Sequence, residues 1–140
     1  MGLNRCREPS RLVLGDTLRI VRILIADDNQ LVRRGIAGLL STGENYEVCG
    51  EAVNAEEAIQ KTHDLSPDVV LLDVSMPGTN GLETARLLRQ QAPEVKILIV
   101  SHHDLNQLLP RSLEAGADGC LDKARIATDL LPTLRKIFQS

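Results

Sequence analysis

The stretch that decides the fold of this 140-residue chain is VVLLDVSMPG, residues 69–78. Four apolar residues run without interruption into Asp73, a pattern typical of a short strand buried on both faces of a parallel sheet. A carboxylate at the end of such a strand either caps a helix or is a functional group at the rim of the sheet. Pro77 and Gly78 disfavour a helix that begins directly after Asp73. The stretch therefore predicts a buried strand that presents Asp73 for chemistry.

The sequence on either side repeats the same alternation. Apolar runs typical of strands occupy residues 20–26, 46–52, 95–100 and 119–121, and apolar residues recur at helical spacing between and after them. Strands that alternate with helices in this way form parallel sheets with right-handed crossovers and helices on both faces. We therefore expect an α/β three-layer sandwich of five parallel strands and five helices.

Capping residues and prolines set the expected limits of the helices. Asn54 and Asn80 are expected N-caps, Asn80 as part of a capping box, and Gly116 is expected to end the fourth helix. Proline lacks the N–H that a helix interior needs. We therefore expect Pro110 to begin its helix or to kink it, and Pro132 to lie in the first turn of the last helix or to bend it.

Composition excludes several classes of function. The chain is 43% hydrophobic and 25% charged, as in ordinary globular domains. Its two aromatic residues cannot form a stacking platform for single-stranded nucleic acid, and a net charge of −3 argues against a duplex-binding surface. No apolar run approaches the roughly 18 residues of a membrane span. Three scattered cysteines indicate reduced thiols and a cytoplasmic protein. Residues 1–19 are expected to be an N-terminal arm before a single domain over 20–140.

Polar side chains stand at the ends of four expected strands. They are Asp27 and Asp28, Asp73, Ser101, and Lys123. The carboxyl ends of parallel strands meet at one edge, so these groups should converge there. Three adjacent carboxylates repel one another unless a cation joins them, and hard oxygen ligands suit Mg²⁺, with Mn²⁺ as the alternative. Asp73 would act as a nucleophile toward phosphorus, while Lys123 and Ser101 would hold the anionic group.

These motifs together resemble the receiver domain of two-component response regulators, over roughly residues 20–140. The resemblance rests on the Asp27-Asp28 pair, Asp73-x-x-Met76-Pro77-Gly78-x-x-Gly81, Ser101, and Gly116-Ala117-Asp118-Gly119 leading to Lys123. It implies a flavodoxin-like (CheY-like) sheet of strand order 2-1-3-4-5. It further implies phosphorylation of Asp73 by a histidine kinase or phosphotransfer protein, with no direct nucleic acid contact by this domain.

The resemblance also assigns roles to single residues. It implies that Asp27, Asp28 and Asp73 bind Mg²⁺, with the backbone carbonyl of Ser75 as a further ligand. It implies that Lys123 pairs with the phosphoryl group. It implies that Ser101 moves to hydrogen-bond that group. The charge added by phosphorylation would bias a two-state element at the face built from the last two strands and helices. A homodimer is a further partner to be considered.

Three positions depart from the usual pattern of the family. Cys120 stands where an aromatic residue or histidine usually swings inward, so the output is expected to be transmitted differently or weakly. Ala124 follows the lysine, which resembles the NarL/LuxR-type subfamily, whose receivers precede a helix-turn-helix DNA-binding domain. No such domain fits after Ser140, so any control of transcription would act through a domain absent from this chain. His102 follows Ser101 where a small residue is usual, and we expect its ring to narrow access to the site.

Two other classes of function compete with the switch. A degenerate receiver would act only as a protein-binding module, but the acid, serine and lysine set is complete. A phosphatase of the haloacid-dehalogenase type would use an aspartyl-phosphate intermediate. That family has a second aspartate two residues after its nucleophile, whereas this chain has Ser75. The leading expectation is therefore a phosphoryl-accepting signalling switch that is not an enzyme in the usual sense.

Overall fold

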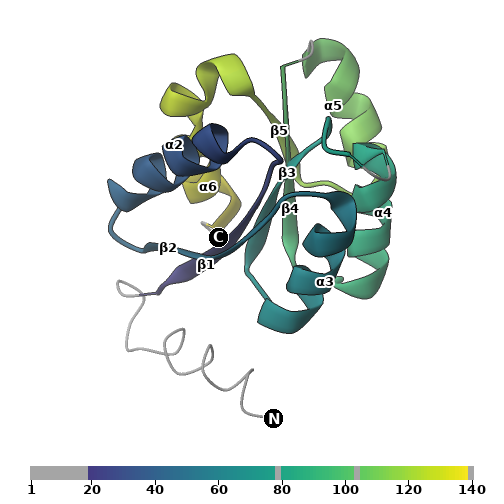
Figure 1. The fold of residues 1–140 in the computed structure, drawn as a ribbon. Coiled ribbons are helices and arrows are strands. Elements are labelled where there is room, and N and C mark those ends of the chain that lie inside the picture. The colour runs from purple at the N-terminus through teal and green to yellow at the C-terminus, as the bar shows by residue number, and fades with distance from the viewer. Residues whose placement is uncertain (1–18, 78–79, 103–104, 139–140) are drawn as a thin grey trace.

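The computed structural model describes residues 19–77, 80–102 and 105–138 (Figure 1). Most of the expected arm over 1–19, and Gly78 of the deciding stretch, lie outside these residues. The strands are β1 (Val21–Ala26), β2 (Tyr46–Ala52), β3 (Val69–Asp73), β4 (Lys96–Ser101) and β5 (Gly119–Asp122). The helices are α2 (Gln30–Ser41), α3 (Ala55–Leu65), α4 (Gly81–Gln91), α5 (Leu105–Glu114) and α6 (Ile126–Phe138), and a 3₁₀ turn, η1 (Lys123–Arg125), precedes α6.

The five strands form one parallel sheet in the order β2-β1-β3-β4-β5. This order confirms the expected fold class. The central position of β3 follows from its sequence, since all five of its residues are buried, as a strand covered on both faces requires. The register places Asp73 beside Val100 of β4, so the carboxylate lies at the edge where the neighbouring strands also end.

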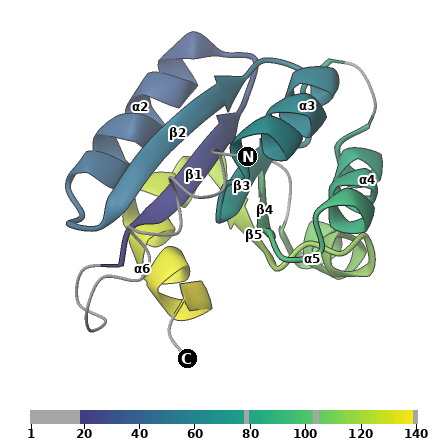
Figure 2. The ribbon, with the colours of Figure 1, turned by 90° about the horizontal axis from the view of Figure 1, so that it is seen from below.

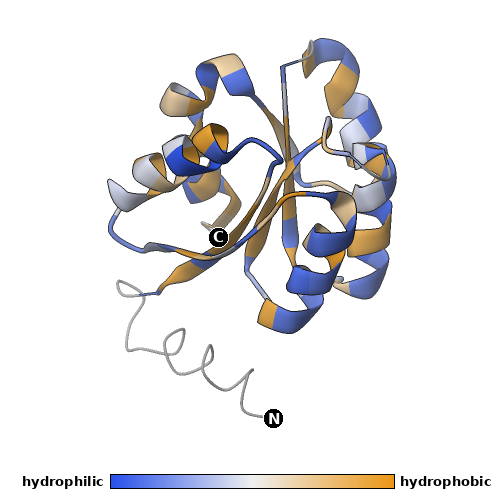
Figure 3. Cartoon of the chain, viewed as in Figure 1, coloured by the Kyte–Doolittle hydropathy of each residue, from blue (hydrophilic) through white to orange (hydrophobic). Residues whose placement is uncertain are grey.

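Helices cover both faces of the sheet, as Figures 1 and 2 show: α2 and α6 lie on one side, and α3, α4 and α5 on the other. Each side has its own apolar core. One core includes Ile23 and Leu71 with Leu134 of α6, and the other includes Leu24 and Leu72 with Leu88 of α4. Figure 3 shows the apolar strands between helices whose apolar and polar faces alternate. Successive strand residues thus supply opposite cores.

The expected capping residues are in place, but among the described residues the Glu83 side chain makes no bond back to the Asn80 N–H, so the capping box is only half formed. Asn54 accepts a hydrogen bond from the backbone N–H of Glu57, and Asn80 accepts from those of Leu82 and Glu83. The Glu83 carboxylate also forms an ion pair with Arg86 at 3.1 Å. Gly116, which follows α5, has a φ of 99°, a conformation that favours glycine.

Each of the two prolines was expected either at the start of its helix or at a kink or bend in it. The placement at the start is wrong for both, and a kink or bend stays a prediction. Helix α5 begins at Leu105, well before Pro110, and Pro132 lies in the middle of α6 rather than in its first turn. Both prolines are exposed, so water can reach the carbonyl groups that they leave without a helical partner. The buried residues of each helix lie on both sides of its proline, and their packing outweighs one lost hydrogen bond.

In the part of the chain that the structure describes, every helix is too short or too polar to cross a membrane.

Candidate functional site

The carboxyl edge of the sheet brings three acidic residues together. Asp27 and Asp28 follow β1, and Asp73 is the last residue of β3. One carboxylate oxygen from each lies within 4.8 Å of the others. Asp27 and Asp73 are buried, whereas Asp28 is exposed. Strands β1 and β3 are direct neighbours, and this pairing produces the cluster that the sequence predicted.

Lys123 supplies the cation of this cluster. It follows β5 directly, and its Nζ lies 2.8 Å from Asp27 Oδ2 and 3.3 Å from Asp73 Oδ2. Burial alone would lower the pKa of Lys123, but the hydrogen bond to Asp27 and the charge of Asp73 outweigh it, so the pKa is raised. The ammonium therefore stays charged at neutral pH. It balances only one of the three adjacent carboxylates.

The carboxylate of Asp73 is held on both sides. Its Oδ2 faces Lys123, and its Oδ1 accepts hydrogen bonds from the backbone N–H of Ser75 at 3.0 Å and from the Ser75 hydroxyl at 2.9 Å. Sequence reasoning gave Ser75 only a carbonyl role, so its two donors are an addition. The two contacts fix the orientation of a group that the sequence predicted as a nucleophile.

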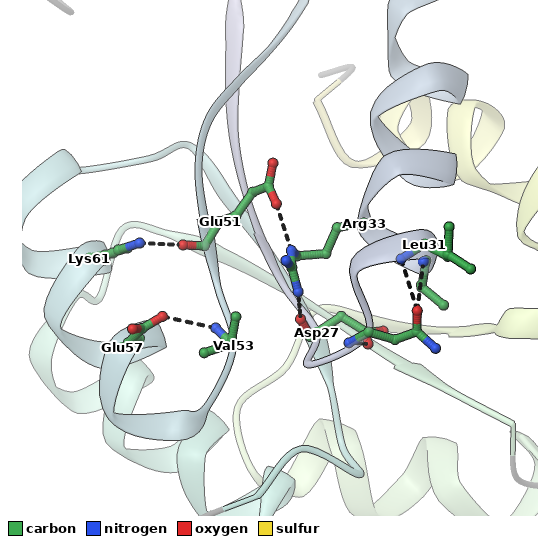
Figure 4. A network of polar contacts seen from close by, with 9 residues as sticks. Asp27, Leu31, Arg33, Glu51, Val53, Glu57 and Lys61 are labelled. Carbon is green, nitrogen blue, oxygen red and sulfur yellow. Dashed lines mark hydrogen bonds and ion pairs between the residues drawn. The ribbon is translucent and has the colours of Figure 1, made fainter.

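Asp27 is held through both its carboxylate and its backbone carbonyl. Its Oδ1 accepts a hydrogen bond from the backbone N–H of Asn29 at 2.9 Å, and its Oδ2 is buried, with the Lys123 ammonium as its neighbour. Arg33 Nη1 donates to the Asp27 carbonyl oxygen at 2.7 Å. Arg33 is also paired through Nε with Glu51 of β2 at 2.6 Å, as Figure 4 shows.

Sequence reasoning missed the contribution of Arg33 and Glu51. A signal was present, because side chains in the first turn of a helix lean toward its N-terminus and so toward the preceding strand end. The sequence could not show which acceptor Arg33 would find. The β1–β2 pairing decides this, since it places Glu51 beside Ile25, close to the end of β1.

The remaining predicted residues are Ser101, His102 and Cys120. Ser101 is buried at the end of β4, where it pairs in register with Asp122 of β5. His102 is exposed, and its effect on access stays a prediction. Cys120 is half-buried in β5 and accepts a contact of 4.0 Å from the Ser112 hydroxyl of α5.

The surroundings of Cys120 disfavour its thiolate form. Burial raises its pKa above the ordinary value of a thiol, although the hydrogen bond from Ser112 acts in the opposite direction. Cys49 and Cys120 are both free, as the sequence predicted for scattered cysteines. Cys120 packs against the core on the α3–α4–α5 side of the sheet.

The acidic cluster fits a hard divalent cation. It contains three carboxylates, and Lys123 can neutralise only one of them. The buried Oδ2 of Asp27 has no neighbour besides Lys123 that donates a hydrogen bond to it. Asp28 is exposed, so the cluster is open to solvent on that side. Mg²⁺ takes oxygen ligands and keeps several waters, which suits a site open on one side. Receiver domains bind Mg²⁺ at such an acidic pocket, and these residues could hold it.

A parallel sheet of this order, with an acid cluster and a lysine at its carboxyl edge, defines a family. Residues 23–135 match the response regulator receiver domain. The chain belongs to this family. Receiver domains act as signalling switches in two-component systems rather than as classical enzymes.

Individual relatives place the chain among NarL/LuxR-type receivers. It is similar to a LuxR-family response regulator from Aurantimonas sp. SI85-9A1, with 32% identity, a TM-score of 0.80 and 84% of each chain covered. It is also similar to the receiver domain of the response regulator NarL from Mycobacterium tuberculosis, with 31% identity, a TM-score of 0.78, and 84% of this chain and 95% of that one covered.

Among curated relatives, the chain is 37% identical to the response regulator GacA of Pseudomonas viridiflava, over 85% of this chain and 56% of the relative. It is 32% identical to the response regulator protein VraR of Staphylococcus epidermidis, over 85% of this chain and 57% of the relative. The chain therefore spans little more than half the length of the curated relatives that it matches.

Proposed function

We propose that this protein is a phosphoryl-accepting switch in which Asp73 receives a phosphoryl group from a histidine kinase or a phosphotransfer protein. The observation that carries the proposal is the approach of carboxylate oxygens from Asp27, Asp28 and Asp73 to within 4.8 Å, with the Lys123 ammonium against two of these residues. Family membership supports the same function.

In the proposed reaction, a carboxylate oxygen of Asp73 forms a bond to phosphorus while the bond between phosphorus and the nitrogen of the donor histidine breaks. The contacts of Asp73 with Ser75 and Lys123 orient this carboxylate before the transfer. Lys123 then pairs with the phosphoryl oxygens, and the hydroxyl of Ser101 donates a hydrogen bond to them. The charge of Lys123 stabilises the product and is already in place at neutral pH.

Asp27, Asp28 and Asp73 would hold Mg²⁺, or Mn²⁺ in its place, with the backbone carbonyl of Ser75 as a further ligand. When bound there, the cation would supply positive charge that stabilises the phosphoryl oxygens. Asp28 is the exposed member of the set, so it would be the ligand on the solvent side of the site. Asp27 and Asp73, which are buried, would lose part of their mutual repulsion when the cation binds.

The output of the switch would be carried by the face of β4, β5, α5 and α6. Phosphorylation adds up to about two negative charges at Asp73. The two side chains that would bind the phosphoryl oxygens are Ser101, at the end of β4, and Lys123, directly after β5. Cys120 of β5 contacts α5 through Ser112, so a movement of β5 reaches that helix through a small side chain. We propose that partners on this face include a second copy of the chain.

The domain limits and setting follow the same proposal. Residues 20–140 would form the receiver and 1–19 a separate arm. By analogy with the longer RcsB response regulator of Salmonella typhimurium, whose structure is described for DNA interaction, the output would be control of transcription through a DNA-binding domain beyond these 140 residues. We place the protein in the cytoplasm, because it belongs to the response regulator receivers and the free thiols of Cys49 and Cys120 suit that compartment.

The test is incubation with acetyl phosphate and Mg²⁺, followed by intact mass measurement. We expect wild type to gain the mass of one phosphoryl group, to lose it in acid or hydroxylamine, and to gain nothing when Mg²⁺ is removed by a chelator. Asp73→Asn should gain nothing. Asp118→Asn, a change of the same kind at the opposite end of the sheet, should react as wild type does. An adduct that persists in Asp73→Asn would overturn the proposal.

A further inference from the structure

The peptide group between the two adjacent acids is held by a side chain that the proposed reaction does not use. Arg33 Nη1 donates to the carbonyl oxygen of Asp27 at 2.7 Å, and the Arg33 side chain is only 11% exposed. This oxygen belongs to the peptide group that links Asp27 to Asp28. Because a peptide group is planar, one bond to its carbonyl fixes the direction in which the chain leaves toward Asp28.

Asp27 and Asp28 depend on this bond to different degrees. Asp27 is fixed independently, since its backbone N–H donates to Ala52 at 2.9 Å and its Oδ1 accepts from Asn29. Asp28 is exposed, and among the described residues its carboxylate makes no polar contact. The position of Asp28 therefore rests on the peptide plane that Arg33 holds.

Arg33 is itself anchored by the neighbouring strand. Its Nε lies 2.6 Å from Glu51 Oε1, and the backbone carbonyl of Glu51 accepts from Lys61 of α3 at 2.5 Å. Figure 4 shows the guanidinium between the Glu51 carboxylate and the Asp27 carbonyl. A planar guanidinium can make both contacts at once in fixed directions, which a lysine ammonium cannot do.

We propose that Arg33, anchored by Glu51, is a positioning residue for the cation site, and that it acts by holding Asp28 within reach of a divalent cation. This inference rests on the proposed function. The charge of Arg33 makes the inference testable, because a positive group near the cluster repels a cation. Removal of that charge would strengthen Mg²⁺ binding through space, whereas loss of the hydrogen bond would weaken it through position.

Two substitutions at Arg33 separate these effects. The dissociation constant for Mg²⁺ would be measured by titration calorimetry on the full chain, at a temperature well below each melting midpoint. Arg33→Gln removes both the positive charge and the planar guanidinium that makes the two contacts, whereas Arg33→Lys removes the guanidinium and keeps the charge. We expect Arg33→Lys to weaken Mg²⁺ binding about tenfold, as is typical when a group that orients a metal ligand is lost. Arg33→Gln should weaken it by a smaller factor, because the lost repulsion partly offsets the lost position. Glu51→Gln should weaken it by a smaller factor, about threefold, because a neutral acceptor holds Arg33 less firmly.

Arg34→Gln is the matched control, since it removes an exposed arginine from the adjacent position of the same helix. It should leave Mg²⁺ binding unchanged. A second measurement needs no metal: the backbone amide resonance of Asp28 should shift in Arg33→Gln and Glu51→Gln and stay in place in Arg34→Gln.

The outcomes are distinct. Tighter Mg²⁺ binding in Arg33→Gln with no change in Arg33→Lys would show repulsion alone and overturn the inference. Lower melting midpoints with unchanged Mg²⁺ binding would show a purely structural tie and also overturn it. If Arg33→Gln does not fold, Arg33→Lys and Glu51→Gln decide. Failure of the wild type to bind Mg²⁺ would overturn the proposed function, and with it this inference.

Discussion

At the amino-terminal edge of the sheet, Asp68 accepts a hydrogen bond of 2.8 Å from the backbone N–H of Arg22, and Asp118 accepts one of 2.8 Å from that of Ile97. At the carboxyl edge, Asp27 and Asp73 share the ammonium of Lys123 and stand beside a third acid. Each acid at the amino-terminal edge thus precedes one strand and binds the backbone of its neighbour. At the opposite edge, Asp27 and Asp73 both contact one counterion, the ammonium of Lys123.

The difference separates stability from function within one sheet. Asp118 also pairs with Arg89 at 2.8 Å, and Arg89 donates to the carbonyls of Gly116, Pro93 and Val95. These groups stay satisfied whatever binds elsewhere. The carboxyl edge keeps more negative charge than its lysine balances, so it is stabilised by anything that brings positive charge. Aspartates therefore hold neighbouring strands together at the amino-terminal edge, whereas at the carboxyl edge their excess negative charge favours the binding of a cation.

The largest expected effect is at Lys123. Lys123→Met leaves three carboxylates without their cation, two of them buried, and we expect a loss of about 3 kcal/mol in the free energy of unfolding at pH 7 with chelator present. Mg²⁺ should restore more stability to this variant than it adds to wild type. Urea unfolding with and without Mg²⁺ measures both. An equal loss in the two conditions would contradict the view that this edge lacks positive charge.

The opposite edge should respond differently. Arg89→Met keeps the alkyl chain but removes donors from three carbonyls and Asp118, so we expect a loss of about 2 kcal/mol that Mg²⁺ does not reduce. Arg86→Met is the control on the same helix, because it breaks only an exposed ion pair with Glu83 and should cost less than about 0.5 kcal/mol. Similar losses of unfolding free energy in Arg89→Met and Arg86→Met would mean that the Arg89 contacts stabilise the fold no more than an exposed ion pair does.

Alkaline pH gives a smaller effect with a definite sign. Since the pKa of Lys123 is raised in the folded state, its ammonium stabilises the fold at every pH below the ordinary lysine pKa. That contribution falls as pH rises through the raised value. The stability difference between wild type and Lys123→Met should thus be constant from pH 7 to about pH 9 and narrow above about pH 10.4.

Tyr46 also titrates in the alkaline range. Burial raises its pKa, so its neutral form too contributes stability that is lost at high pH. It is present in both proteins and cancels in the difference between their unfolding free energies. A difference that widens with pH in denaturant unfolding would show that Lys123 is not the group responsible.

The smallest expected effect is a gain. Asp28→Asn removes one of three repelling charges from an exposed position, and we expect it to raise stability by about 0.5 kcal/mol in chelator while weakening Mg²⁺ binding. Glu94→Gln, an exposed acid at the other edge, should change neither quantity. Thermal unfolding and calorimetric titration of the two variants give the comparison. A loss of stability in Asp28→Asn would mean that repulsion among the three carboxylates does not destabilise the fold.

The fold and the convergence of the site could be predicted from the sequence because both follow from short-range patterns. The run that ends at Asp73 has the composition of a central strand, and parallel strands necessarily bring their ends to one edge. The starting points of the two helices that contain prolines were predicted less well. A helix tolerates Pro110 and Pro132 when they face solvent and apolar neighbours on both sides are buried, which depends on tertiary packing.

What the sequence could not show is how groups share partners. Nothing in the spacing of Ser75 indicates that its hydroxyl donates to Asp73, or that Arg33 reaches a carbonyl rather than a carboxylate. These contacts depend on angles within loops and on the β1–β2 pairing that brings Glu51 near β1. Sequence patterns predict which residues meet, whereas their hydrogen-bond partners depend on three-dimensional detail.

Gly81 is the first residue of α4, and a Cβ there would collide with the backbone and side chain of Val74, the residue directly after Asp73. In a scan of all substitutions at this position we expect alanine to be nearly as damaging as any larger residue, because the first carbon atom already has no room. Such a site would be missed by any search for reactive side chains. The tolerance of this protein to sequence change near Asp73 is thus limited by space as much as by chemistry.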